Sequence, residues 1–125
     1  MNFKELIDRI RIRPGMYVGK YDLNCLELFT GGFIFCLQAN GIDMEFTDVY
    51  RKFFNFFVQS RVLEKVNEDL KKELRFNNGM SYIQLIPFAE SDTKKQFDFY
   101  FECFDEFKKL CDQNYDFEPI KEKFM

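Results

Sequence analysis

Aromatic residues near the C-terminus recur at helical spacing, and this pattern constrains the fold more than any other feature of the sequence. The apolar stripe of this segment consists of Phe97, Tyr100, Phe101, Phe104, Phe107 and Cys111. Residues three and four apart share one side of an α-helix, so the stripe must be buried against other elements. Ser91 and Asp92 are suited to cap this helix, which we expect to end near Leu110. Phe supplies 18 of the 125 residues, so the core should be aromatic.

Four further segments are predicted to be helical from the spacing of their apolar residues. They cover about residues 2–12, 22–40, 47–59 and 63–76. The expected caps and stop signals are Asn2 with Glu5, Asp22, Thr47, Gly41 and Asn77-Asn78-Gly79. The tail from Asp112 to Met125 has enough apolar residues to fold back partly. The sequence therefore predicts an all-α fold, a compact bundle of five to six helices in a single domain of residues 1–125.

Residues 80–88 fit either a strand or a helix. Alternating residues that would share one strand face are Tyr82, Gln84 and Ile86. Ser81 followed by Gln84 instead fits a capping box that opens a short helix, which Pro87 would end. We favour the helix because no partner strand is evident.

A short motif links the first two predicted helices. It reads Arg13-Pro14-Gly15-Met16-Tyr17-Val18-Gly19. Pro14 fixes its own φ and favours extended geometry at the preceding residue, so the first helix should stop there. The two glycines allow turns, and we expect a short extended elbow near residues 15–19. The motif is either a structural connection or a site where guanidinium groups and backbone amides bind an anion.

The segment of residues 22–40 is apolar on most sides, which is typical of a central helix. Gly31 and Gly32 lie in its middle, where each costs about 1 kcal/mol relative to Ala. We expect a compensating close approach by another helix or by the elbow at Met16 and Tyr17. A ligand contact is the alternative.

The four cysteines fit no metal site. Their positions, 25, 36, 103 and 111, match no zinc spacing, and the chain has no His to complete a site. We expect Cys25, Cys36 and Cys103 to be small buried side chains in a reducing compartment, with disulfides as the alternative. No metal and no cofactor is predicted.

Charge and composition limit the possible functions. The net charge of −3 disfavours direct binding to nucleic acid, which requires a basic surface. No apolar run reaches membrane-spanning length and the first residues resemble no secretory signal, so we expect no membrane association and a cytoplasmic location. Without His, and without a serine in a Gly-x-Ser-x-Gly setting, the chain is not expected to be an enzyme.

One side of the last predicted helix is acidic. It carries Asp98, Glu102, Asp105 and Glu106, and Asp112 follows. From residue 90 to the C-terminus, ten acidic and six basic residues give a local charge of −4. Like charges at this spacing repel mildly. The stripe is either a solvated face or a docking surface for a basic partner.

The motif from Arg13 to Gly19 resembles the entry to the ATPase domain of gyrase-type topoisomerases. In that family the next helix carries a catalytic Glu and a metal-binding Asn, arranged as Glu-x-x-x-Asn. Here Glu27 is followed four residues later by Gly31, and no later Asp-x-Gly-x-Gly motif occurs. We therefore reject an ATPase.

A resemblance over most of the chain points to another class. Four stretches, Arg13 to Gly19, Leu26 to Gly32, Phe53 to Phe57 and Phe97 to Phe107, are similar to immunity proteins of contact-dependent and other polymorphic toxin systems. This resemblance implies a helical protein that neutralises a cognate toxin one-to-one by occlusion. A nuclease suits the acidic helix, because its active site must be positive to hold phosphates. The alternative is a helical adaptor or regulatory module without a toxin partner.

Overall fold

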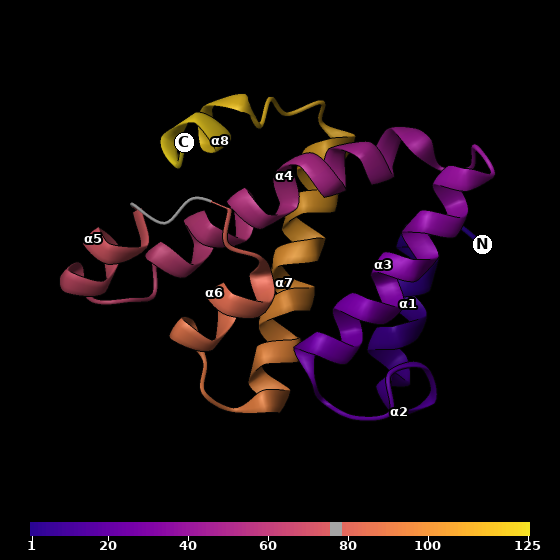
Figure 1. Ribbon diagram of the computed structural model, residues 1–125, viewed down its shortest axis with the longest axis horizontal. Helices are drawn as coiled ribbons and strands as arrows, with labels where there is room; N and C mark the ends of the chain where they lie inside the picture. Colours follow the sequence, from indigo (N-terminus) through magenta and orange to yellow (C-terminus); the bar gives the residue numbers. More distant parts are fainter. Residues whose placement is uncertain (76–78) are drawn as a thin grey trace. The chain divides into compact units, whose positions relative to one another are not determined.

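The computed structural model describes residues 1–75 and 79–125, which form eight α-helices and no strand (Figure 1). The all-α prediction is therefore confirmed, whereas the expected number of five to six helices is wrong. The described residues divide into two compact units, residues 1–50 and residues 51–125. That residues 1–125 form a single domain stays a prediction.

The first unit contains α1 (Phe3–Ile12), α2 (Pro14–Tyr17), α3 (Leu23–Ala39) and the start of α4 (Met44–Leu63). Helix α2 is a single turn that packs against α1, where the chain reverses before α3 (Figure 1). The buried residues of α1 and α3 are Phe3, Leu6, Ile7, Ile10, Leu23, Leu26, Thr30, Ile34 and Leu37. Each helix therefore contributes one apolar face to the core of this unit.

The N-terminus of α1 is capped from two places in the sequence. The backbone N–H of Glu5 donates to Oδ1 of Asn2 at 2.9 Å, as the local sequence predicts. The N–H of Phe3 donates to Oδ2 of Asp43, 40 residues away, also at 2.9 Å. Asp43 adopts a left-handed backbone with φ of 55° just before α4. This one residue therefore ties the start of α1 to the start of α4.

Helix α4 begins at Met44, so the predicted start and the predicted cap at Thr47 are wrong. Thr47 lies inside the helix and is fully buried. Its hydroxyl donates to the carbonyl oxygen of Asp43 at 2.8 Å. A threonine one turn into a helix can bond back to the preceding turn in this way, so its presence alone does not locate a helix start.

The extended elbow expected near residues 15–19 is also wrong. Pro14 is the first residue of the helical turn α2, where its fixed φ suits a helix and its missing N–H costs nothing. Arg13 is non-helical as predicted, with φ of −138°. The carbonyl oxygen of Pro14 accepts from the N–H groups of Val18 at 2.8 Å and Gly19 at 3.2 Å. Gly19, with φ of 84°, then ends the turn in a conformation that favours glycine.

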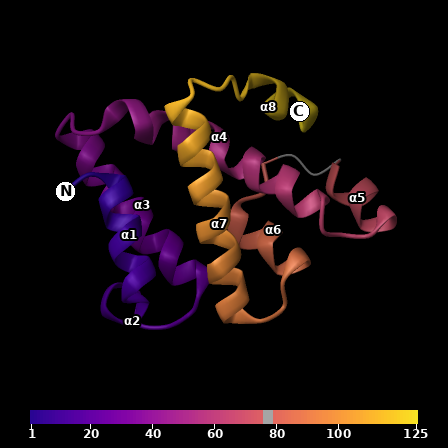
Figure 2. The ribbon, with the colours of Figure 1, turned by 180° about the vertical axis from the view of Figure 1, so that it is seen from behind.

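The second unit contains the rest of α4, α5 (Glu68–Arg75), α6 (Tyr82–Ala89), α7 (Thr93–Asp112) and α8 (Glu118–Lys123). Helix α6 packs beside α7 (Figure 2). The ring of Phe54 lies 5.3 to 6.2 Å from four other rings, those of Tyr82, Tyr100, Phe104 and Phe107. The predicted aromatic stripe of α7 is buried, except that Cys111 is half-buried.

The segment predicted as one helix over residues 63–76 is shorter than expected. Leu63 ends α4, and α5 begins after Asn67, whose Oδ1 accepts from the N–H of Leu70 at 2.9 Å. Asn67 is thus a local cap that divides the apolar pattern. Gly79 is left-handed, with φ of 76°, whereas the rest of the predicted stop, Asn77 and Asn78, lies outside the described residues.

The structure shows a helix, α6, where the sequence fits either helix or strand. The N–H of Ser81 donates to Oε1 of Gln84 at 3.2 Å, as the capping box predicts. The N–H of Tyr82 donates to Oδ1 of Asn55 on α4 at 3.0 Å. Pro87 lies inside α6 rather than ending it, because its own φ is compatible with a helix and only one backbone donor is lost.

The C-terminal tail folds back onto its own unit, as expected. Phe117 and Phe124 are buried. The ring of Phe117 lies 4.7 Å from that of Phe107 and 5.7 Å from that of Phe53. Glu118, the first residue of α8, pairs with Lys52 of α4 at 3.4 Å. Ring contacts and one exposed ion pair therefore hold α8 in place.

Candidate protein-binding surfaces

The acidic face of α7, defined as Asp98, Glu102, Asp105 and Glu106, is exposed. The residues between these carboxylates, including Tyr100, Phe101 and Phe104, are buried. Burial on one side of the helix fixes the direction in which the carboxylates on the other side point. The exposed candidate residues of α7 therefore project from a firmly packed helix.

Glu106 takes part in an ion-pair network. Its carboxylate lies 2.6 Å from the guanidinium of Arg61, which also pairs with Glu64 at 2.9 Å. The same guanidinium lies 5.0 Å from the centre of the Phe57 ring. Asp98 forms a solvent-exposed pair with Lys94 at 3.5 Å, and such pairs contribute little. Glu106 thus helps to join α4 to α7.

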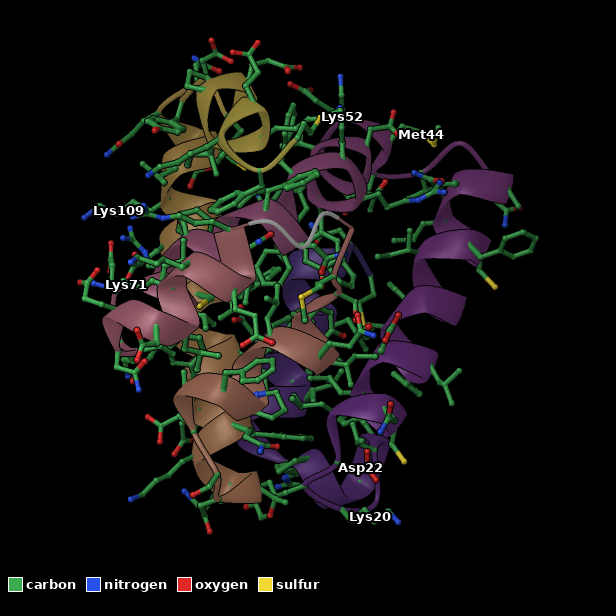
Figure 3. All side chains as sticks on the ribbon, turned by 60° about the vertical axis from the view of Figure 1, so that its left-hand side comes forward. Lys20, Asp22, Met44, Lys52, Lys71 and Lys109 are labelled. Carbon is green, nitrogen blue, oxygen red and sulfur yellow. The ribbon has the colours of Figure 1, made fainter. Side chains whose placement is uncertain are left out.

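A lysine interrupts the acidic face. Lys109 follows Asp105 by four residues and precedes Asp112 by three, so all three share one side of α7. It is exposed and points away from the helix (Figure 3). Asp112 is also exposed but is the last residue of α7, separated from the four carboxylates by this cation. The local charge of −4 counted from residue 90 includes Lys109, but the acidic stripe was defined without regard to the place of Lys109 on the helix.

The motif of residues 13–19 is only partly brought together. A pocket of about 160 Å³ is lined by Pro14, Gly15, Gly19, Lys20 and Tyr21. The other motif residues do not line it: Arg13 and Met16 are exposed, and the ring of Tyr17 contacts that of Phe29 at 6.1 Å. Lys20, the one cation of this lining, lies 3.9 Å from Asp22 (Figure 3). The structural role of the motif, as a helix connection, is therefore the better supported interpretation.

Helix α3 exposes an apolar face that the sequence argument expected to be buried. Leu28 is 78% exposed and Phe35 is 74% exposed. Gly31 and Gly32 lie between them and are exposed. A methyl group added at either would meet no heavy atom within 4 Å beyond the adjacent backbone of α3 itself. The predicted close approach to these glycines is therefore wrong. Helical spacing identifies one buried stripe, but it cannot show that a second apolar stripe is buried too.

Exposed apolar side chains gather in the first unit. The described chain has twelve large hydrophobic residues classed as exposed, and nine of them lie within residues 1–50. These nine are Met1, Ile12, Met16, Tyr21, Leu28, Phe29, Phe35, Ile42 and Met44. Of these nine, Leu28 and Phe35 share one side of α3, seven residues apart, and contiguous apolar patches are typical of surfaces that bind another macromolecule.

The cysteines are free thiols with different environments. Cys103 is buried, and burial raises the pKa of its thiol to about 12. Cys25 is half-buried, whereas Cys36 is exposed, so the prediction that Cys36 is buried is wrong. Its position beside Phe35 places it at the border of the exposed apolar side of α3. Within residues 1–75 and 79–125, no three His, Cys, Asp or Glu side chains are grouped so that they could hold a metal ion.

Glu27, the position that resembles a catalytic glutamate, is half-buried on α3. Burial raises the pKa of its carboxyl above the usual value. Four residues on, the exposed Gly31 offers no side chain to share a metal ion with it. That the chain is not an enzyme stays a prediction.

The chain matches no protein family, no curated protein and no solved structure. Among the described helices, none combines the length and the apolar character needed to span a bilayer. Functional inference therefore depends on the two exposed surfaces, the acidic face of α7 and the apolar face of α3.

Proposed function

We propose that this protein is an immunity protein that binds a cognate bacterial toxin, a nuclease, and occludes its active or partner-binding surface. The observation that carries the proposal is the exposed acidic face of α7, in particular Asp98, Glu102 and Asp105. A nuclease needs a positive surface to hold a phosphate backbone. Opposed charges on the two proteins would speed their encounter and favour the correct pairing.

The packing of α7 supports this role. Its buried aromatic side chains hold the helix, so a partner would not have to order it on binding. Avoiding such ordering preserves affinity. Glu106 is engaged by Arg61 and would contribute mainly to the local negative field, and Asp112 would lie at the edge of the surface beyond Lys109. The proposal requires no metal and no cofactor, and it places the protein in the cytoplasm, where a nuclease would reach nucleic acid.

The test uses the toxin that the neighbouring gene encodes. An immunity gene is expected directly downstream of the C-terminal region of a large toxin gene. Expression of that toxin region should kill cells, and coexpression of this chain should protect them. Purified together, the two should form a one-to-one complex in light scattering, and nuclease activity should fall in proportion to the chain added. The proposal would be refuted if coexpression of this chain does not relieve the killing and no complex forms in vitro.

A helical adaptor or regulatory module is the second candidate, and the exposed apolar face of α3 favours it. Large exposed side chains such as Leu28 and Phe35 are suited to contact with another protein. An adaptor would bind its partner through this face and give no protection against a toxin. Substitution of Phe35 by Glu in the protection assay separates the two functions, because toxin binding through α7 should persist.

A further inference from the structure

The exposed face of α3 has a composition that suits another helix. Its residues are Asn24, Leu28, Gly31, Gly32, Phe35 and Ala39. They recur at intervals of three and four, so they form one stripe along the helix. Two large apolar side chains flank two glycines, which add no bulk. A methyl group built on either glycine would meet no heavy atom within 4 Å beyond the adjacent backbone of α3. A second helix could therefore approach the backbone closely between Leu28 and Phe35.

The stripe is symmetric about its own centre, the point between Gly31 and Gly32. Leu28 and Phe35 lie equally far from this point along the chain. If two α3 helices cross antiparallel about a two-fold axis there, Leu28 of one copy lies opposite Phe35 of the other. Gly31 then lies opposite Gly32. In a two-fold interface residue i contacts residue j while j contacts i, and this arrangement follows that pattern.

We propose that a second copy of this chain covers the face, in a two-fold antiparallel pair of α3 helices. The charge pattern favours a copy over a basic partner. The stripe carries no charged side chain, although the whole chain has a net charge of −3. An uncharged contact keeps like charges apart in a homodimer, whereas a basic partner would gain nothing from it. Antiparallel helices also place opposite ends of their dipoles together.

The exposed area of the stripe suits a weak, reversible dimer. The two residues of the stripe with large apolar side chains, Leu28 and Phe35, are 78% and 74% exposed. At roughly 200 Å² for a large side chain, these two residues together expose about 300 Å². A stable interface buries about 800 Å² on each partner, and the bare helix surface at the two glycines and Ala39 adds to the side chains. The dimer should therefore form in a concentration-dependent way.

The first experiment measures the oligomeric state of the full chain. Sedimentation velocity over a wide concentration range should show a monomer–dimer equilibrium. Phe35→Glu should raise the dimer dissociation constant by about a hundredfold, since one substitution acts twice in a two-fold interface. Phe88→Glu is the matched control, because Phe88 is also exposed but lies on α6, and it should leave the equilibrium unchanged.

A second experiment tests the register. Leu28→Glu combined with Phe35→Glu puts like charges opposite each other and should abolish the dimer. Leu28→Lys combined with Phe35→Glu puts opposite charges together and should restore dimerisation in a salt-dependent way. Both positions are exposed, so circular dichroism should show folded variants.

Three results would overturn the inference. The wild-type chain could be monomeric at all concentrations. The Phe35 and Phe88 variants could weaken a dimer equally. The two charge pairs could behave alike. If the wild type is monomeric and Phe35→Glu abolishes binding of the toxin region, α3 is the toxin-binding face instead. Because dimerisation is measured without toxin, its failure leaves the proposed function of α7 to be judged by its own assay.

Discussion

Asp43 is the position where a single substitution should reveal most about the first unit. Its carboxylate accepts a hydrogen bond from the N–H of Phe3 at 2.9 Å, and its backbone is left-handed, with φ of 55°. Substitution by Ala removes the acceptor and leaves a residue poorly suited to this backbone. Substitution by Asn keeps an acceptor oxygen and a side chain that tolerates the left-handed region. Substitution by Gly tolerates the backbone but removes the acceptor.

The magnitudes follow from these two contributions. Loss of the bond leaves an N–H of the fully buried Phe3 without its capping partner, at a cost of about 1–2 kcal/mol. A left-handed Ala adds about 1 kcal/mol. Asp43→Ala should therefore destabilise by about 2–3 kcal/mol and Asp43→Gly by about 1–2 kcal/mol. Asp43→Asn should cost less than about 1 kcal/mol, because both features are kept.

Urea denaturation followed by far-UV circular dichroism measures this series. The midpoints should fall in the order Asn, Gly, Ala. Equal midpoints for Ala and Asn would show that the bond to Phe3 contributes nothing to stability. Equal midpoints for Gly and Ala would refute the argument from the left-handed backbone.

Three further predictions concern α3 and the cysteines. Gly31→Ala and Gly32→Ala should each stabilise the monomer by about 0.5–1 kcal/mol, because Ala favours a helix and its methyl group meets no neighbouring residue. Denaturation at low protein concentration measures this effect. A loss of stability would show that another part of the protein packs against these glycines. Cys36 should react fast with a thiol reagent in the native protein, whereas Cys103, buried and with a pKa of about 12, should react only on unfolding; mass spectrometry of labelled peptides distinguishes them. Burial raises the pKa of the Glu27 carboxyl in the folded protein. Once the pH exceeds the pKa of this carboxyl in the unfolded chain, its ionisation favours the unfolded state and lowers stability. Glu27→Gln removes this cost, so it should stabilise the protein more at neutral than at acid pH. A pH-independent difference between the two denaturation midpoints would contradict this.

Local signals in the sequence predicted much of the fold. Asn2, Asp22 and Asp92 cap their helices as expected, because an N-cap requires only a side-chain oxygen within reach of the next turn. The capping box of Ser81 and Gln84 correctly favoured a helix for the ambiguous segment. The buried stripe of α7 also followed from spacing alone. In each case the interacting residues are separated by no more than about one or two turns.

Features that depend on distant residues could not be predicted in this way. Asp43 caps α1 across 40 residues, and no local pattern indicates such a contact. Pro14 was interpreted as an interruption, although a proline also suits the first position of a helix, as in α2. A proline can therefore either interrupt a helix or begin one, and tertiary packing decides which of the two occurs.

The candidate surfaces show the same division. The exposure of Asp98, Glu102 and Asp105 followed from their positions opposite an aromatic stripe. The pairing of Glu106 with Arg61 did not, because it joins two helices. The exposure of Leu28 was missed, since an apolar residue is normally taken to be buried.

The most direct test of the proposed function is the rate at which this chain associates with the toxin region encoded upstream of its gene. The test variant carries Asp98→Lys, Glu102→Lys and Asp105→Lys. The matched control carries Glu45→Lys, Asp69→Lys and Glu122→Lys, which are exposed positions scattered over other helices. Both sets change the net charge equally, so only the location of the charges differs. Circular dichroism should show that both are folded.

Stopped-flow association at low and high salt then gives the answer. The α7 variant should associate at least about tenfold more slowly than the wild type at low salt, and the difference should shrink as salt screens the charges. The control should be slowed much less. Equal rates for the two variants, or a wild-type rate for the α7 variant at low salt, would contradict the claim that this acidic face meets a basic toxin.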